Sequence, residues 1–114
     1  MAISEFEIFK IQKMLSQFCA NRNKYYPPDQ LLINYRIEDQ SIYIFEIRPH
    51  WKNPSEKLES MTAKIQYVKS KSLWKLYWQR QNLKWNLYEP FESSKDLSEV
   101  LKIIDEDAHG CFWG

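Results

Sequence analysis

Hydrophobic residues near the N-terminus recur at the three- and four-residue spacing of one helix face. They are Ile8, Ile11, Leu15 and Phe18. Ser4, followed three residues later by Glu7, matches a capping box, in which the two side chains bond backbone N–H groups of the first turn. The pattern predicts a helix that begins at Ser4 and ends near Asn21, because Pro27 and Pro28 prevent its continuation.

A second helix is predicted near the C-terminus from the same spacing. Its buried stripe consists of Leu97, Val100, Leu101 and Ile104. We expect this helix to begin at Ser93 or Ser94, since serine is a favoured N-cap, and Gly110 limits its end.

Between the helices the apolar spacing becomes alternating, which is typical of strands. Residues 31–37 and 41–48 are predicted to form two strands around a turn at 38–40. The second strand is apolar on both faces, so we expect it to be central in the sheet and covered from both sides. Pro49 ends this strand, and the polar segment 50–60 is predicted as a loop.

Residues 61–88 predict three further strands joined by two-residue turns at 70–71 and 81–82, and these turns fix the register. One face then carries opposed apolar pairs: Tyr67 and Trp74, Ile65 and Leu76, Trp78 and Trp85, Leu76 and Leu87. The other face carries opposed polar pairs: Lys64 and Tyr77, Lys75 and both Gln66 and Tyr88, Gln79 and Lys84. The chain is thus predicted to be one α+β domain spanning 1–114, with an N-terminal helix, a five-stranded mostly antiparallel sheet and a C-terminal helix in two layers.

Charge is distributed unevenly along this chain. The formal net charge of the whole sequence is +1, which argues against a general polyanion-binding protein. Residues 61–88, however, contain six basic residues and no acidic one, so the remainder of the chain carries a net charge of −5. The sheet face that collects these basic residues is therefore the surface most suggestive of a partner.

That face has the residue types of a site for single-stranded nucleic acid. Lysines contact phosphates, and exposed aromatic rings stack on unpaired bases. The candidate residues are Lys64, Lys75, Tyr77, Arg80, Lys84 and Tyr88. Two other interpretations stay open: a solvated face on which lysine stems lie over tyrosine rings, and a face that the acidic last helix covers.

A protein–protein role is the alternative hypothesis. Trp, Tyr and Arg dominate interface energetics, and the edge strands need pairing or protection, which a homodimer would provide. The apolar C-terminal segment 111–114 is expected to pack, either within its own chain or on a neighbour.

Catalytic and metal-binding motifs are weak in this sequence. Glu46, Arg48 and His50 alternate on one strand face and have the groups for acid–base chemistry in a small enzyme, although a Glu–Arg pair on a strand more often has a structural role. His109 and Cys111 match no standard zinc spacing, and the sequence has no phosphate-binding glycine loop or nucleophile elbow. We expect a non-enzymatic binding domain without a metal or small-molecule cofactor.

The predicted location follows from features that the sequence does not show. Acidic residues stand near the N-terminus where a signal peptide needs basic ones, and no apolar run approaches the roughly 20 residues that span a bilayer. Cys19 and Cys111 are too few for a disulfide framework. We expect reduced thiols, a cytoplasmic location and no membrane partner; a bridge between the two cysteines is the less favoured alternative.

Several short motifs in the chain are unusual. They are Tyr35-Arg36-Ile37, residues 45–49 (FEIRP), residues 74–78 (WKLYW), residues 83–85 (LKW) and residues 111–114 (CFWG). In these motifs the chain resembles the uncharacterised bacterial family catalogued as domain of unknown function 3024. The resemblance covers nearly the whole chain and implies a bacterial protein of one domain. It implies no activity and transfers no catalytic or binding residue.

Overall fold

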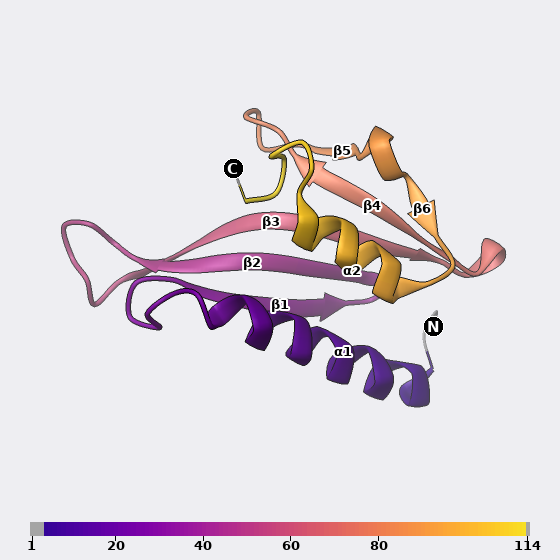
Figure 1. Cartoon of the computed structure of the whole chain (residues 1–114), viewed down its shortest axis with the longest axis horizontal. Helices are drawn as coiled ribbons and strands as arrows, with labels where there is room; N and C mark the ends of the chain where they lie inside the picture. The colour runs from indigo at the N-terminus through magenta and orange to yellow at the C-terminus, as the bar shows by residue number, and fades with distance from the viewer. Residues whose placement is uncertain (1–3, 114) are drawn as a thin grey trace.

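The computed structural model describes residues 4–113 and has the predicted α+β architecture (Figure 1). Its elements are α1 (Glu5–Asn23), β1 (Leu32–Glu38), β2 (Ser41–Pro49), β3 (Lys57–Val68), η1 (Lys69–Lys71), β4 (Leu73–Gln79), β5 (Trp85–Leu87), η2 (Glu89–Phe91), β6 (Ser93–Ser94) and α2 (Leu97–Glu106). The strands form one antiparallel sheet in the order β1-β2-β3-β4-β5, and β6 adds a short pairing with β4. Sheet and helices make two layers, as predicted.

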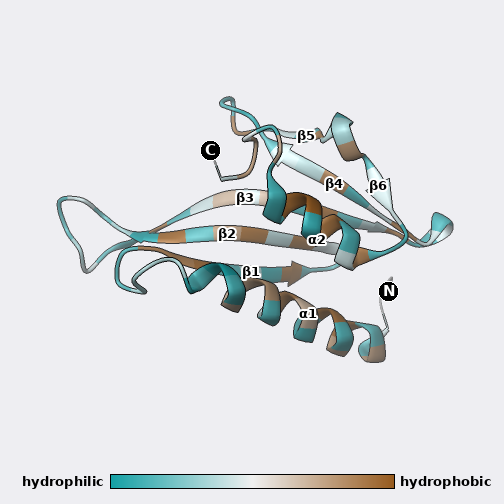
Figure 2. Cartoon of the chain, in the orientation of Figure 1, coloured by the Kyte–Doolittle hydropathy of each residue, from teal (hydrophilic) through white to brown (hydrophobic). Residues whose placement is uncertain are grey.

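Both helices pack on the same face of the sheet. The buried residues of α1 and α2 join one cluster with the inward side chains of β1 to β4. Its fully enclosed members include Leu15, Ile42, Ile44, Ala63, Ile65, Leu76, Val100 and Ile104. Figure 2 shows hydrophobic and hydrophilic segments alternating along both helices, which reflects this one-sided stripe. We call this sheet surface the covered face and the opposite surface the open face.

The predicted N-terminal cap of α1 is confirmed, and the predicted N-terminal cap of α2 is wrong. The Ser4 side chain accepts a hydrogen bond from the Glu7 backbone N–H at 3.2 Å, as the capping box predicts. We expected α2 to begin at Ser93 or Ser94, and this is wrong. These serines pair with β4, and Asp96 is the N-cap instead. Asp96 followed three residues later by Glu99 is itself a capping signal in the sequence.

The central position of β2 is confirmed, but its predicted cover is not. The strand lies between β1 and β3, and helices cover one of its faces. On the open face, Phe45 is still buried, because the Arg36 guanidinium lies over its ring at 4.9 Å and neighbouring side chains enclose it. Side chains of the sheet itself thus replace the second layer that we expected.

Strand β3 is longer than predicted. It begins at Lys57, inside the segment 50–60 that we expected to be a loop, since Lys57 pairs with Pro49 and Leu58 with Arg48. The connecting loop is therefore shorter and lies beyond the end of β1.

The β3–β4 register is confirmed, and the β4–β5 register is wrong by one residue. Tyr67 faces Trp74 and Ile65 faces Leu76, but Trp85 pairs with Gln79 instead of Trp78. The predicted pairs Leu76 with Leu87, Lys75 with Tyr88 and Gln79 with Lys84 are wrong for the same reason.

The cause of this shift is the length of the β4–β5 turn. The Leu83 N–H donates to the Arg80 carbonyl at 2.8 Å, the Arg80 N–H donates to the Lys84 carbonyl at 3.2 Å, and Leu83 has a φ of 63°. This is a three-residue loop that ends in a left-handed residue. One residue more than the expected two moves every side chain of β5 to the other face.

The outer edge of β1 is blocked by two asparagine side chains. Asn23 of α1 donates to the Ile33 carbonyl at 3.0 Å and accepts from the Ile33 N–H at 2.7 Å, as a neighbouring strand would. The Asn34 side chain accepts from the Tyr35 N–H at 2.8 Å. These bonds protect part of the edge from pairing with another chain.

Residues 111–113 of the C-terminal segment pack within their own chain, and Gly114 lies outside the described residues. Asp107 ends α2 in the left-handed conformation, and its carboxylate accepts from the backbone N–H groups of Phe112 and Trp113. The Trp113 ring stacks on Phe18 and lies 3.9 Å from the Arg22 guanidinium carbon. Of the two packings that we considered for this tail, the structure has the intramolecular one.

Candidate nucleic-acid interface

The open face carries a row of alternating cations and rings across the strands. The register places Arg36 of β1 beside Tyr43, Tyr43 beside Lys64, Lys64 beside Tyr77 and Tyr77 beside Leu87. We call these five residues the transverse row. Its members are half-buried, so each presents part of its side chain to solvent. Since both helices lie on the other face, neither helix covers this row.

Ring and ammonium contacts organise the row. The Lys64 Nζ lies 5.7 Å from the ring centroids of both Tyr43 and Tyr77, within the range of a cation–π interaction. Trp85 of β5 lies beside Tyr43, with ring centroids 6.1 Å apart. The Tyr77 hydroxyl donates to the Gln66 side chain at 3.2 Å. Two aromatic rings therefore flank one ammonium group on the face that neither helix covers, and a third ring, Trp85, lies beside Tyr43.

The charge of the open face is positive in its centre and mixed at one edge. Arg36 forms a 3.1 Å ion pair with Glu59 and a 3.9 Å pair with Glu38. Lys75 lies opposite Gln66, next to the Lys64–Tyr77 pair. The Lys64 and Lys75 ammonium groups are the cations of the middle strands, and the acids lie toward β1 and the end of β3.

Three of the six predicted nucleic-acid contacts lie on the open face, and three do not. Lys64, Lys75 and Tyr77 are there. Arg80 and Lys84 close the β4–β5 turn, and Tyr88 is only 2 % exposed and packs on Phe112 with ring centroids 4.9 Å apart. The shifted register of β5 explains the misplacement of Lys84 and Tyr88, whereas the alternation of β4 puts Arg80 on the side of Leu76 and Trp78.

Sequence reasoning missed three rings and a cation that the fold adds to this face: Arg36, Tyr43, Phe45 and Trp85. A signal for Tyr43 and Phe45 was present, because the alternation of β2 puts them on the face opposite Ile42 and Ile44. Their role was hidden by the expectation of a covering layer. For Trp85 no comparable signal exists, since its face depends on the turn length.

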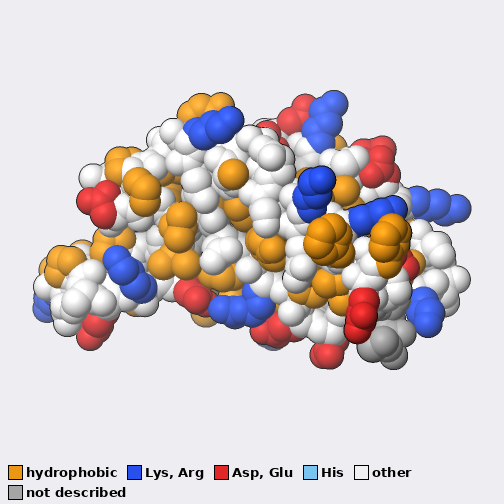
Figure 3. Space-filling view, turned by 90° about the horizontal axis from the view of Figure 1, so that it is seen from below, with side chains coloured by type: hydrophobic (Ala, Val, Ile, Leu, Met, Phe, Trp, Pro, Cys, Tyr) orange, Lys and Arg blue, Asp and Glu red, His pale blue; other side chains and the backbone are white. Residues whose placement is uncertain are grey.

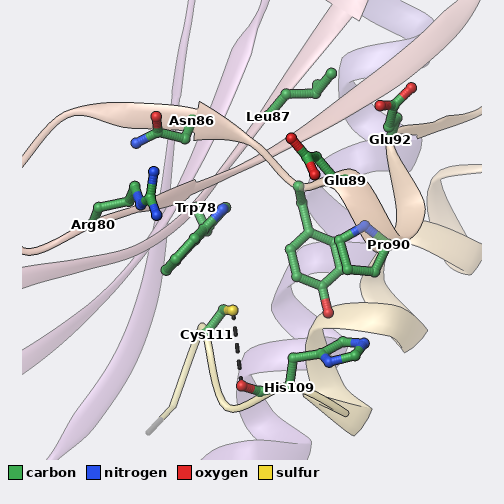
Figure 4. A pocket seen from close by; sticks show the side chains of 10 residues that line it. Trp78, Arg80, Asn86, Leu87, Glu89, Pro90, Glu92, His109 and Cys111 are labelled. Atoms are coloured by element: carbon green, nitrogen blue, oxygen red, sulfur yellow. Dashed lines mark hydrogen bonds between the residues drawn. The ribbon is translucent and has the colours of Figure 1, made fainter.

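Arg80 and Tyr88 instead line a hollow of about 420 Å³ beside β5 (Figure 4). The Arg80 guanidinium lies 5.3 Å from the Trp78 ring centroid, and His109 and Cys111 form the opposite wall. Burial raises the pKa of the Tyr88 hydroxyl, and the nearby Cys111 and Asp107 raise it further.

The surroundings of the cysteine in this hollow favour its neutral thiol. Burial, and then the Asp107 carboxylate, raise the pKa of the Cys111 thiol, while Arg80 opposes them. The thiol lies 3.9 Å from the His109 carbonyl oxygen, to which it donates (Figure 4). A thiol that stays protonated is a poor nucleophile and a poor metal ligand.

Glu46, Arg48 and His50 serve local structure. Arg48 lies 3.5 Å from Glu46 in an ion pair. His50 Nδ1 accepts from the backbone N–H groups of Lys52 and Asn53 at 3.1 and 3.3 Å, so the imidazole holds the turn that follows β2. The acid–base function that we considered for this cluster stays a prediction.

Within residues 4–113, no group of three or more His, Cys, Asp and Glu side chains comes together as a metal site requires. Cys19 and Cys111 are free thiols, so the disulfide alternative does not match the structure. Burial raises the pKa of the Cys19 thiol to about 11. In the same described range, no helix has the length and hydrophobicity to cross a membrane.

A second uncovered surface lies on the outer side of α1. Phe6 and Phe9 are 69 % and 68 % exposed, and the Lys10 ammonium lies 4.6 Å from the Phe6 ring centroid. Figure 3 views the molecule from this side and shows hydrophobic side chains next to Lys and Arg side chains at the surface.

Comparison with known proteins gives a family but no function. Searches of curated proteins and of solved structures found no match. A family model described as Domain of unknown function (DUF3024) matches residues 3–114. The motifs that suggested this family from the sequence are spread over the α+β fold described above, and the chain belongs to the DUF3024 family.

Proposed function

We propose that the protein binds single-stranded nucleic acid through the open face of its sheet. The observation that carries this proposal is the transverse row, in which Tyr43 and Tyr77 flank the Lys64 ammonium on a surface that neither helix covers. Half-buried rings on a sheet are rigid platforms for base stacking, and ammonium groups between them contact the phosphates that link the bases.

The geometry favours unpaired over paired nucleic acid. Stacking on Tyr43, Tyr77 and Trp85 requires a base face that a duplex does not expose. The formal net charge of +1 for the whole chain also predicts moderate affinity that falls with salt, because few phosphates are neutralised. Lys64 and Lys75 are the proposed phosphate contacts, and Arg36 joins them if a phosphate replaces Glu59.

Fluorescence polarisation with labelled single strands of about 12 nucleotides tests the proposal, with salt varied from about 50 to 200 mM. Tyr43→Leu is expected to weaken binding by roughly 5- to 150-fold, the usual cost of one stacking contact. Lys64→Gln is expected to reduce the salt slope by roughly one unit.

Lys13→Gln is the matched charge control, since Lys13 is exposed on α1, away from the sheet. It is expected to leave affinity and salt slope nearly unchanged. The absence of saturable binding by the unaltered protein at low salt contradicts the proposal, and so does equal weakening by Lys13→Gln and Lys64→Gln.

The proposal includes a bacterial, cytoplasmic location. Free thiols at Cys19 and Cys111 are compatible with a reducing compartment. Detection of the native protein in the soluble cytosolic fraction of its host is the expected result, and recovery in a secreted or membrane fraction contradicts it.

Protein–protein interaction, including a homodimer, is the alternative proposal. Exposed Phe6 and Phe9 on α1 favour it, whereas the Asn23 and Asn34 bonds along β1 disfavour a dimer formed by edge pairing. Light scattering over a range of concentrations separates these cases, and a monomer at all concentrations contradicts the homodimer.

A further inference from the structure

Strands β2 and β3 extend beyond the rest of the sheet as a two-stranded arm. The pairing of β1 with β2 stops at Leu32 and Ile47, while β2 and β3 continue to pair through Pro49 and Lys57. The turn that closes the arm, residues 50–56, forms one end of the long axis (Figures 1 and 3), along which the molecule extends 46 Å. We call residues 50–56 the arm tip.

The arm tip presents an exposed indole. Trp51 is 80 % exposed, although tryptophan is among the residues that gain most from burial. Its ring stacks on His50, with centroids 5.9 Å apart and planes inclined by 20°, and the Lys52 ammonium lies 4.8 Å from its centroid. The tip thus repeats the combination of ring and ammonium that forms the transverse row.

Hydrogen bonds within the tip hold this indole in place. The His50 Nδ1 atom accepts hydrogen bonds from two backbone N–H groups. The backbone N–H of His50 donates to the Glu56 carbonyl at 2.9 Å. The Ser55 hydroxyl donates to the Asn53 side chain at 2.6 Å. These bonds fix the turn that carries Trp51, and a fixed turn lowers the entropy that binding must remove.

The charge of the arm favours an anionic partner. Residues 48–57 contain three basic residues, Arg48, Lys52 and Lys57, against one acidic residue, Glu56; Arg48 is paired with Glu46, so Lys52 and Lys57 supply the excess. A ring next to the Lys52 ammonium group suits the base and phosphate of a nucleotide. A hydrophobic protein partner does not require this excess of cations.

We infer that Trp51 is a second stacking contact for the same single strand that the transverse row binds. This inference rests on the proposed function and extends it to the length of the ligand. Tyr43 and Trp51 are eight positions apart along β2 and its continuation. At about 3.3 Å per residue the span is at most roughly 26 Å, because Trp51 lies in the turn after β2, and this corresponds to no more than about eight stacked nucleotides at about 3.4 Å each.

Two strand lengths test this inference: about 4 nucleotides, too short to reach both contacts, and about 12, long enough for both. Trp51→Ala is expected to lower the affinity for the longer strand by roughly 5- to 150-fold and to leave the affinity for the shorter strand unchanged. Trp51→Phe keeps a ring and is expected to recover most of the affinity. Because Trp51 is exposed, neither substitution removes a core contact.

The two proposals fail in different ways. If the unaltered protein binds both lengths and Trp51→Ala binds the longer strand normally, the arm tip is not a contact, while the transverse row keeps its role. Equal losses on both lengths also overturn the inference, because the tip would then be the main site. If the unaltered protein binds neither length but its Trp51 associates with anionic lipid vesicles, both proposals fail.

Discussion

Leu76 and Tyr77 are neighbours in β4, yet their side chains lie in two different environments. Leu76 points to the covered face and is completely enclosed by aliphatic side chains and helices. Tyr77 points to the open face, half-buried, next to an ammonium group. The covered face consists of buried apolar side chains that stabilise the core, whereas the rings and cations of the open face are partly exposed to water. The difference separates residues that hold the fold from residues available to a ligand.

The largest expected effect tests the covered face. Leu76→Ala should lower the free energy of unfolding by roughly 3 kcal/mol, because a cavity replaces a fully buried side chain. Tyr77→Ala should cost about 1 kcal/mol, since water already reaches its ring. Urea denaturation of both variants measures this contrast. Equal losses would mean that the open face is a second core and not a binding surface.

The stability of the protein at alkaline pH tests whether the interior of the covered face excludes water from Cys19. The folded pKa of Cys19, about 11, lies above its ordinary value of 9.0. The neutral thiol therefore contributes stability that is fully present below pH 9.0 and is lost as pH rises through about 11. We expect a loss of about 2 kcal/mol over this range. Cys19→Ala should show a smaller decline; identical pH profiles for the two proteins would argue against a buried neutral thiol.

Removing the hydrogen bonds at the β1 edge is expected to lower stability moderately. Asn23→Ala removes two hydrogen bonds to Ile33 and is expected to cost roughly 1–2 kcal/mol. Asn21→Ala, on the same helix but exposed, is the control. Light scattering should also detect more association of the Asn23 variant, because an unblocked edge can pair with another chain. A stable and strictly monomeric variant would show that the edge needs no such protection.

The smallest expected effect concerns the turn that assigns β5 side chains to their faces. Leu83 is exposed and has a φ of 63°, a conformation that costs a residue with a Cβ roughly 1–2 kcal/mol. Leu83→Gly should therefore raise stability by about 1 kcal/mol, while Leu83→Ala should not. Thermal unfolding measures both. A Gly variant that is less stable would show that the leucine side chain makes contacts that outweigh the strain.

Local signals in the sequence predicted the parts of the fold that depend on neighbouring residues. The Ser4 cap, the buried stripe of α2 and the alternation in β4 each follow from spacing along one element. The β4–β5 register was missed because it depends on the length of a turn without glycine, in which a leucine takes the left-handed conformation. The sequence contains no sign that Leu83 would do so.

The candidate site was predicted in part for the same reason. Lys64, Lys75 and Tyr77 belong to the hairpin whose register was correct. Trp85 depends on the hairpin that was shifted, and Tyr43 depends on which face the helices cover, a property of the whole fold. Spacing along a strand identifies residues that share a face, but the tertiary packing decides whether that face meets water.

The contacts between the two ends of the chain have a consequence for synthesis on the ribosome. Arg22 forms a 2.8 Å ion pair with Asp105, which is 83 positions later, and Phe18 stacks on Trp113. The apolar stripe of α1 therefore lacks its α2 neighbours until residues 97–106 have been synthesised. A nascent chain arrested before residue 97 would lack Val100, Leu101 and Ile104 from the shared core and would leave the sheet partly uncovered, a state that chaperones for emerging polypeptides recognise.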